Sequence, residues 1–336
     1  MEYRRLGNTG LKLSQLSLGS WATFGHGADE AEAERIMTTA HEAGINFFDN
    51  AEAYAEGEAE RMMGRILRKV AWSRDAWCVS SKVFWGGKAP TQMGLSRKHV
   101  HDACNGALQR LQTDYLDLFF CHRPDPETPI EETVRAMNEL ITMGKVRYWG
   151  TSEWSPAQIR EAGWIADRLG LVGPAMEQPQ YNLLERYNVE IGLHRLLDKG
   201  LGLTTWSPLA SGILTGKYRD GIPEGSRLSR PTFAFLRPKL EAARSQAHLI
   251  GQLVALAGEL NTSPAVLAIA WCTANPRVST VILGASNQNQ LRENLKAVEV
   301  CKQLTPAVLD RIDGIIGDTR AKRAIGRLAA RLKGNG

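Results

Sequence analysis

Three short apolar segments each end in a side chain that can take part in proton transfer. The segments are INFFD, ending at Asp49, WCVSSK, ending at Lys82, and YLDLFFCH, ending at His122. Tyr54 follows Asp49 after a short step in DNAEAY. A single polar residue at the end of a strand usually does nothing more than meet solvent. Three ionisable groups at equivalent places in successive segments favour one functional cluster.

These residue types fit the reduction of a carbonyl group. A hydride that reaches the carbonyl carbon leaves an alkoxide that needs a proton, and a free phenol with a pKa of about 10 donates slowly near neutral pH. A neighbouring ammonium is expected to lower the pKa of the phenol. We therefore assign Tyr54 as the proton donor, with Lys82 tuning its pKa and Asp49 orienting Lys82. His122 would hold the carbonyl oxygen by a hydrogen bond.

The elements that must position these residues form a regular alternation of β-like runs and amphipathic helices. A short hairpin pattern over residues 3–14 comes first. Consecutive runs after it lie about 30 to 40 residues apart, which fits one βα unit each. The runs are LSLG (16–19), INFFD (45–49), WCVSSK (77–82), YLDLFFCH (115–122), RYWGT (147–151), AMEQ (175–178), LGLTTW (201–206) and VSTVIL (278–283).

Eight βα units predict an α/β fold of the (β/α)8 or TIM barrel type, as one domain over residues 1–318. The competing architecture is an open doubly wound sheet, but no G-x-G-x-x-G follows the first run. Helix starts support the alternation. Ser96 and Ser263 are expected to cap helices, and Thr128 with Glu131 predicts a capping box before the helix that ends near Gly144.

Composition is that of an ordinary globular protein: 336 residues, 43% hydrophobic and 23% charged. No apolar stretch approaches the roughly 20 residues that cross a bilayer, and the first residues do not resemble a signal peptide. The five cysteines are widely spaced and form no C-x-x-C pair, so we expect reduced packing residues and a cytoplasmic protein.

The net charge of +5 is concentrated in a basic C-terminal tail over residues 319–336. Removing the six cations of this tail leaves −1 on the rest of the chain, so no nucleic-acid partner is expected. A solvated tail is the main interpretation, and docking on an acidic partner is a minor one. The six are Arg320, Lys322, Arg323, Arg327, Arg331 and Lys333.

Several long stretches resemble the aldo-keto reductases, most closely the branch that contains the potassium-channel β subunits. The stretches are GSWATFG, NFFDNAEAY, SSKVFWGGKAP, GLSRKHV, HRPDPETPIEETVRAMNELITMGKVRYWGTSEWS, WSPLASGILTGKY and ILGASNQNQLREN. The resemblance covers residues 3–318. It implies a (β/α)8 barrel with extra C-terminal helices that binds a nicotinamide dinucleotide, usually NADPH, without a Rossmann domain.

The resemblance also implies a role for individual residues. Asp49, Tyr54, Lys82 and His122 match the catalytic tetrad. The remaining matches, all to cofactor-binding positions, are Ser152 and Gln178 at the carboxamide, Trp206 on the nicotinamide ring, Ser207, Leu209, Ser211, Lys217 and Arg227 in the pyrophosphate loop, and Gly284, Ser286, Gln290, Glu293 and Asn294 at the adenosine end. Trp21 is placed both at the cofactor and, with Tyr54 and Trp85, in the wall of a substrate pocket.

Two departures from the family bear on function. Animal channel β subunits carry Asn where this chain has His122, which favours a fully equipped reductase. Many members place Lys and Arg around the 2′-phosphate, whereas this chain has Ala285 and Gln290 there. The phosphate would then rely on Ser286 and Arg227, so NADPH is expected over NADH.

Other motifs carry less weight. GILTGKY lacks the spacing of a P-loop, and His99 and His101 lie two residues apart, so they make a poor metal pair and are expected to be solvated. No metal site is expected. A barrel hydrolase using Asp49 and Glu52 is a weak third interpretation.

The sequence thus predicts an NADPH-dependent reductase of aldehydes and ketones. The rival hypothesis is an NADPH-binding accessory or redox-sensing subunit of a potassium channel with slow catalysis. Relatives often form tetramers or octamers, so a homo-oligomer is expected. A channel or other membrane-protein partner is the corresponding partner hypothesis.

Overall fold

The computed structural model describes residues 1–25, 27–244 and 247–316, in two compact units. The first unit contains Met1–Pro179, Arg195–Trp206 and Arg277–Arg292, and the second contains the remaining described residues. The basic tail lies outside the described residues, and the single-domain interpretation of residues 1–318 stays a prediction.

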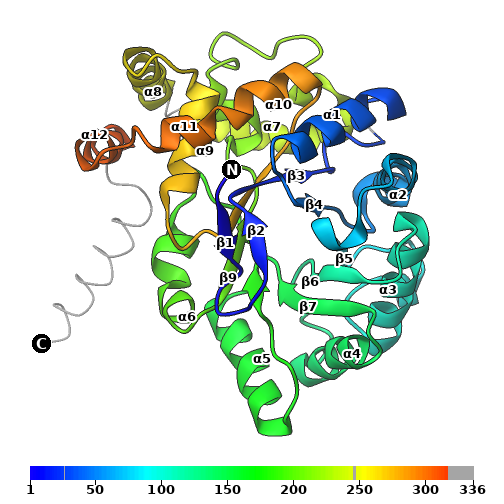
Figure 1. Cartoon of the computed structure of the whole chain (residues 1–336). Coiled ribbons are helices and arrows are strands. Elements are labelled where there is room, and N and C mark those ends of the chain that lie inside the picture. Colours follow the sequence, from blue (N-terminus) through cyan, green and yellow to red (C-terminus); the bar gives the residue numbers. More distant parts are fainter. Residues whose placement is uncertain (26, 245–246, 317–336) are drawn as a thin grey trace, which may run out of the picture. The chain divides into compact units, whose positions relative to one another are not determined.

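The first unit contains a closed barrel of eight parallel strands, in the order β10-β3-β4-β5-β6-β7-β8-β9 (Figure 1). All eight predicted β runs are confirmed as barrel strands, and the predicted fold class is therefore correct. The strands are β3 (Leu16–Gly19), β4 (Phe47–Asp49), β5 (Cys78–Val83), β6 (Leu116–Cys121), β7 (Val146–Thr151), β8 (Met176–Glu177), β9 (Gly202–Thr205) and β10 (Thr280–Leu283).

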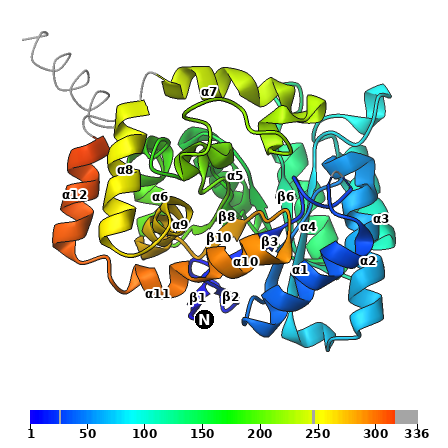
Figure 2. The same cartoon turned by 90° about the horizontal axis from the view of Figure 1, so that it is seen from above.

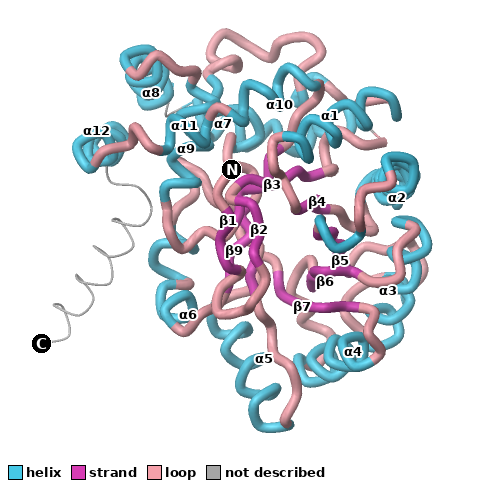
Figure 3. The backbone as a smooth tube through the Cα atoms, in the orientation of Figure 1, coloured by secondary structure: helices cyan, strands magenta, loops and turns pink. Residues whose placement is uncertain are grey.

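Helices cover the outside of this barrel, as Figure 3 shows with strands in magenta and helices in cyan. Each of the first five follows a strand and buries one apolar stripe. They are α1 (Glu30–Glu42), α2 (Glu58–Val70), α3 (Arg97–Leu111), α4 (Ile130–Thr142) and α5 (Pro156–Leu169). Helices α6 (His194–Asp198) and α10 (Gln288–Leu295) each continue from one unit into the other.

The N-terminal hairpin of β1 (Tyr3–Arg5) and β2 (Lys12–Ser14) closes one end of the barrel (Figure 1). Leu6 and Leu13 of this hairpin are fully buried against side chains from the barrel strands, including Leu118 and Phe120. That end is the one where the strands begin, because Phe47 and Cys78 at the starts of β4 and β5 join the same cluster. The opposite end, where the strands finish, remains for a site.

The second unit is mainly helical. Its helices are α7 (Arg237–Arg244), α8 (Ala247–Glu259), α9 (Pro264–Ala274), α11 (Ala297–Cys301) and α12 (Pro306–Ile316), and α8 lies beside α12 in Figure 2. Within the described residues no single helix is long and apolar enough to cross a membrane. The bent pair α8 and α9 passes that test only on joint length and composition.

Two of the three predicted helix caps are confirmed, and one is wrong. Ser96 accepts a hydrogen bond from His99 N and caps α3, and Ser263 caps α9 through Val266 N. The capping box predicted at Thr128 is wrong. Pro129 stands at the N-cap of α4, where no side chain caps the helix, and the Thr128 hydroxyl instead donates to Asp125 at 2.7 Å.

Candidate active site

The four predicted tetrad residues lie together where the strands β4, β5 and β6 end. Lys82 is fully buried at the centre, and its Nζ lies 2.7 Å from Asp49 Oδ2, 2.7 Å from the Asn50 carbonyl and 3.2 Å from the Tyr54 hydroxyl. The three ammonium protons therefore have three partners. The prediction that Asp49 orients Lys82 and that Lys82 contacts Tyr54 agrees with this geometry.

Local sequence explains how each of these side chains is aimed. Along β5 the side chains alternate, so Ser80 and Lys82 both reach Asp49, whereas Ser81 points outward and donates to Glu60. Asp49 Oδ1 accepts from Ser80 at 2.8 Å. The Asp49 carboxylate is thus held in place by hydrogen bonds from both Ser80 and Lys82.

Tyr54 is positioned by an unusual turn that leads into α2. Ala55, Glu56 and Gly57 all have positive φ, at 49°, 53° and 83°. Non-glycine residues rarely adopt this conformation, and such strain concentrates at functional sites. The turn reverses the chain directly after Tyr54 and keeps its ring over Lys82, with Nζ 4.9 Å from the ring centroid.

His122 faces the tyrosine from the end of β6. Their rings meet edge to face with centroids 5.7 Å apart, and the His122 side chain is nearly fully buried. Its Nδ1 has no hydrogen-bond partner among the described residues. Burial, with the positive charges of Lys82 and Arg123, holds the pKa of His122 well below its usual value. The imidazole is therefore neutral near pH 7 and able to donate one hydrogen bond.

The expected pKa shift of Tyr54 is wrong in direction. Burial, and then the negative charge of Asp49, raise the pKa of the phenol well above its usual value, and only Arg123 opposes them. Burial also lowers the pKa of Lys82, against the pull of Asp49. The sequence reasoning considered the ammonium and neglected desolvation, which disfavours both charged forms. Tyr54 thus keeps its proton throughout the physiological range.

Aromatic side chains surround this cluster. The ring centroids of Trp21 and Tyr54 are 6.5 Å apart. Those of Trp85 and His122 are 5.0 Å apart, in an edge-to-face contact. Trp85 is partly exposed, at 39%. Both tryptophans predicted to line a substrate pocket therefore lie beside tetrad residues.

Three residues assigned to the nicotinamide follow the strands β7, β8 and β9 of the same barrel. Ser152 Oγ donates to the Gln178 carbonyl at 2.9 Å, and the Gln178 side-chain amide donates to Asp49 at 3.1 Å. The Trp206 indole donates to Glu153 at 2.9 Å. Ser152 and Gln178 thus form one hydrogen-bonded network with Asp49, Lys82 and Tyr54.

The loop after β10 contains the adenosine-end candidates of the first unit, Gly284, Ser286 and Gln290. Gln290 Oε1 accepts from Ser286 N at 2.9 Å and so folds the loop onto the start of α10. Ala285 is buried, and its carbonyl accepts from Thr23 at 2.6 Å. Between residues 284 and 290 the loop offers hydroxyl and amide groups and no cation. Glu293 and Asn294 continue α10 in the second unit, where Glu293 pairs with Lys296.

The pyrophosphate-loop candidates lie in the second unit. Ser207, Ala210, Ser211 and Gly212 have positive φ, and Ser211 N donates to Ser207 Oγ at 3.2 Å. The buried Tyr218 hydroxyl and Ser226 Oγ have no hydrogen-bond partner among the described residues. Leu209 stands at the start of the turn that contains Ala210, Ser211 and Gly212. Two cations lie further along the same loop. Lys217 Nζ is 5.1 Å from the centroid of the Tyr218 ring, and burial lowers the pKa of Arg227. Two cations with spare hydroxyl donors nearby suit a phosphate group.

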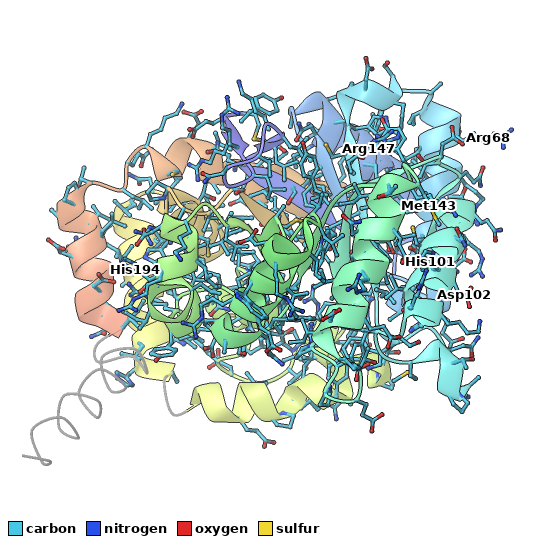
Figure 4. The ribbon with its side chains drawn as sticks, turned by 90° about the horizontal axis from the view of Figure 1, so that it is seen from below. Arg68, His101, Asp102, Met143, Arg147 and His194 are labelled. Atoms are coloured by element: carbon cyan, nitrogen blue, oxygen red, sulfur yellow. The ribbon has the colours of Figure 1, made fainter. Side chains whose placement is uncertain are left out.

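One buried ion pair was missed. His99, expected to be solvated, is only 3% exposed, with its Nδ1 2.9 Å from the Gly94 carbonyl and its Nε2 3.4 Å from Glu52. Burial alone would lower the pKa of His99, but the hydrogen bond to Glu52 and its charge raise it. His101, labelled in Figure 4, instead is partly exposed and faces α4, where its Nε2 lies 2.9 Å from Glu139.

The same contacts weaken the hydrolase interpretation. Glu52 accepts from Phe84 N at 2.8 Å and faces His99, while Asp49 is occupied by Lys82, so the two carboxylates do not act as an acid pair. Within the described part of the chain no group of three or more His, Cys, Asp and Glu side chains is arranged to hold a metal ion.

Comparison with known proteins agrees with this geometry. The aldo/keto reductase family model matches residues 15–317. The chain is 51% identical to a probable voltage-gated potassium channel subunit beta of Oryza sativa subsp. japonica, over 94% of this chain and 97% of the relative. It is 50% identical to the protein of the same name in Arabidopsis thaliana, with the same coverage. With its barrel, its buried Asp-Tyr-Lys-His cluster and these matches, the chain belongs to the aldo/keto reductase family, which supports an oxidoreductase activity.

Proposed function

We propose that the protein reduces aldehydes and ketones to alcohols with NADPH as the hydride donor. The observation that carries this proposal is the contact between Lys82 Nζ and the Tyr54 hydroxyl, at 3.2 Å. Lys82 has no acceptor capacity, so the phenol oxygen must accept this hydrogen bond. The phenol proton then stays available for a substrate oxygen.

The tetrad residues divide the work of proton transfer. A carbonyl oxygen between Tyr54 and His122 would receive the phenol proton as negative charge develops on it. The phenolate that remains is stabilised by Lys82, whose charge is in turn held in place by Asp49. Neutral His122 donates a hydrogen bond to the same oxygen and orients the carbonyl. Bound reduced nicotinamide supplies the hydride in this scheme.

Residues of this chain fit a nicotinamide dinucleotide. Ser152 Oγ already donates to the Gln178 carbonyl and accepts from Arg123, and it retains one lone pair for an amide donor. In the second unit, the unpartnered hydroxyls of Tyr218 and Ser226 near Arg227 match the needs of an anionic group. Because cations flank the pyrophosphate loop of the second unit and are missing from residues 284–290, we attribute the preference for NADPH over NADH to Arg227.

The proposal is tested by titrating the purified protein with NADPH and NADH, followed by tryptophan fluorescence. The loss of NADPH absorbance is then measured with a panel of aldehydes and ketones. We expect tighter binding of NADPH and turnover of aromatic aldehydes, since Trp21 and Trp85 flank the tetrad. A protein that binds NADPH and reduces no carbonyl compound would contradict the proposed activity.

The names of the relatives favour a second candidate, an NADPH-binding accessory or redox-sensing subunit of a potassium channel. Both relatives described above are named as probable channel subunits. Under this hypothesis catalysis is slow and the cofactor reports the redox state. Affinity capture from membranes, with the Tyr54→Phe variant alongside, tests it. Recovery of no channel, together with fast turnover, would exclude it.

We also propose that the protein is a cytoplasmic homo-oligomer, a tetramer or octamer. The thiols of Cys78, Cys104, Cys121 and Cys272 are free and buried, as expected in a reducing compartment. Light scattering of the purified full chain measures the oligomeric mass, and a monomer at micromolar concentration would overturn this part of the proposal.

A further inference from the structure

An arginine beside the tetrad has a positive charge that nothing in the described residues neutralises. Arg123 follows His122 directly at the end of β6 and is half-buried. Its hydrogen bonds run from Nη1 alone, to the His122 carbonyl and to Ser152 Oγ at 3.3 Å. In the described part of the chain Nε and Nη2 have no acceptor, and no carboxylate pairs with the guanidinium.

The guanidinium lies beside Trp85, the aromatic side chain that contacts His122 of the tetrad. Its Cζ is 5.3 Å from the centroid of the Trp85 ring, and that ring is 5.0 Å from His122. Its positive charge also contributes to the low pKa of His122 and Lys82. Arg123 is therefore close enough to act electrostatically on the tetrad, and its guanidinium and the His122 imidazole contact the same indole ring.

The acidic side chains around the tetrad in the described part of the chain have other partners, so none of them neutralises the charge of Arg123. Lys82 is compensated by Asp49 at 2.7 Å, and His122 is neutral. Of the nearby acids, Glu153 binds the Trp206 indole and Glu52 binds Phe84 N. A partly desolvated guanidinium with two free donor positions is suited to bind a carboxylate.

We propose that Arg123 binds a carboxylate on the carbonyl substrate, so that the preferred substrates are aldehydes and ketones carrying a carboxylate on an aromatic body. The aromatic body packs on Trp85 while the carboxylate reaches Nε and Nη2 of Arg123. This inference rests on the proposed reductase function and names its substrate class. Arg123 acts here as a substrate-binding residue and takes no part in proton transfer.

The test compares 2-, 3- and 4-carboxybenzaldehyde with their methyl esters, which keep the ring and the substitution pattern and replace the carboxylate with a neutral, slightly larger group. We expect kcat/KM for at least one acid to exceed that of its ester about tenfold or more, mainly through KM, because hydrogen bonds to charged groups are the stronger ones. High salt should reduce this preference. Equal kcat/KM for every acid and ester pair would overturn the inference while leaving the reductase function intact.

Variants assign the effect to Arg123. Arg123→Gln should lower the acid-to-ester ratio of kcat/KM about 10- to 100-fold, and Arg123→Lys should recover part of that ratio. Because both substrates are measured on the same variant, any effect of the lost charge on the tetrad or on Ser152 cancels in the ratio. Arg68→Gln, an exposed arginine on the outer side of α2 (Figure 4), is the matched control and should change nothing. Urea unfolding of each variant checks that the fold is intact.

Two binding measurements separate the possible failures. If Arg123→Gln weakens NADPH binding by the same factor by which it lowers kcat/KM, the cation serves the cofactor and the inference is wrong. Benzoate binding, followed by tryptophan fluorescence, needs no turnover. A protein inactive on every aldehyde that still needs Arg123 to bind benzoate would retain the carboxylate site and contradict the reductase function instead.

Discussion

The Tyr54 hydroxyl receives a hydrogen bond from Lys82, and its own pKa is raised by burial. We therefore expect Tyr54→Phe to lower kcat by about 10²- to 10⁴-fold, the range typical of a lost general acid. Cofactor affinity should stay within about twofold, because among the described residues the hydroxyl has a hydrogen bond to Lys82 alone. Stopped-flow absorbance and fluorescence titration measure the two quantities.

The matched control for this substitution is Tyr3→Phe on the N-terminal hairpin. The Tyr3 hydroxyl donates to the Gly44 carbonyl at 2.9 Å, far from the tetrad in sequence and at the other end of the barrel. This variant should keep its full turnover. If Tyr54→Phe also retained turnover, another group would be the proton donor.

The buried carboxyl group of Glu177 makes the stability of the fold depend on pH. It is fully buried on β8, and burial raises its pKa to about 8, partly offset by the hydrogen bond from Thr151. The folded protein therefore keeps this proton after the unfolded chain has lost it. The resulting stability is complete below the unfolded pKa of about 4.5 and is lost as the pH rises through about 8.

We expect Glu177→Gln to remove this pH dependence. Relative to the variant, the unfolding free energy of the native chain should fall with rising pH between about 5 and 8, by at most about 1.4 kcal/mol per pH unit. Urea unfolding at several pH values measures it. Glu161→Gln, an exposed glutamate on α5, is the control. A difference that stays constant with pH would contradict the assigned protonation.

At the scale of elements, the buried pair Glu52–His99 connects three segments that bear on the pocket. Glu52 lies in the turn before Tyr54, His99 lies on α3, and Glu52 also accepts from Phe84 N beside Trp85. The backbone of Gly86 lies so close to this pair that a Cβ added to it would be 2.5 Å from His99 Nε2 and 2.9 Å from Glu52 Oε2. No side chain fits there without moving the pair.

Gly86→Ala is therefore expected to destabilise the fold by about 1–3 kcal/mol and to raise KM for aromatic aldehydes, since Trp85 must shift with the loop. Urea unfolding and steady-state kinetics measure the two effects. Gly163→Ala on α5 is the matched control, because nothing lies within 4 Å of its added Cβ. A glycine in the middle of a helix should gain about 0.5–1 kcal/mol from the same change. Equal stability of Gly86→Ala and the native chain would contradict the close contact.

The same elements show what the sequence could and could not predict. Strand ends follow from local patterns, so the apolar runs ending at Asp49, Lys82 and His122 located the tetrad. Burial of His99 depends on Gly94 and Glu52, which approach it from other segments, and periodicity within one helix does not reveal such contacts. Thr128 has the sequence of a capping box, but Asp125 is a competing acceptor three residues earlier. For Arg123 the sequence did contain a signal, because this cation directly follows His122 at the end of a predicted strand.

On the scale of the whole molecule, the functional groups and the excess charge occupy different parts of the chain. Every tetrad and nicotinamide candidate falls between residues 21 and 206, whereas the six tail cations lie beyond residue 318. Without the tail the net charge is −1. The tail can thus change long-range attraction for acidic partners without touching the chemistry.

Deleting residues 319–336 should therefore leave kcat/KM for an uncharged aldehyde and the oligomeric mass unchanged. Binding of the full chain to anionic vesicles or acidic peptides at low salt should weaken in the truncated chain, because the removed segment has cations and no acids. Light scattering, steady-state kinetics and vesicle sedimentation on both chains test this. A truncated chain with a smaller assembly mass would assign the tail to subunit contacts, and one with lower turnover would show that it acts on the barrel.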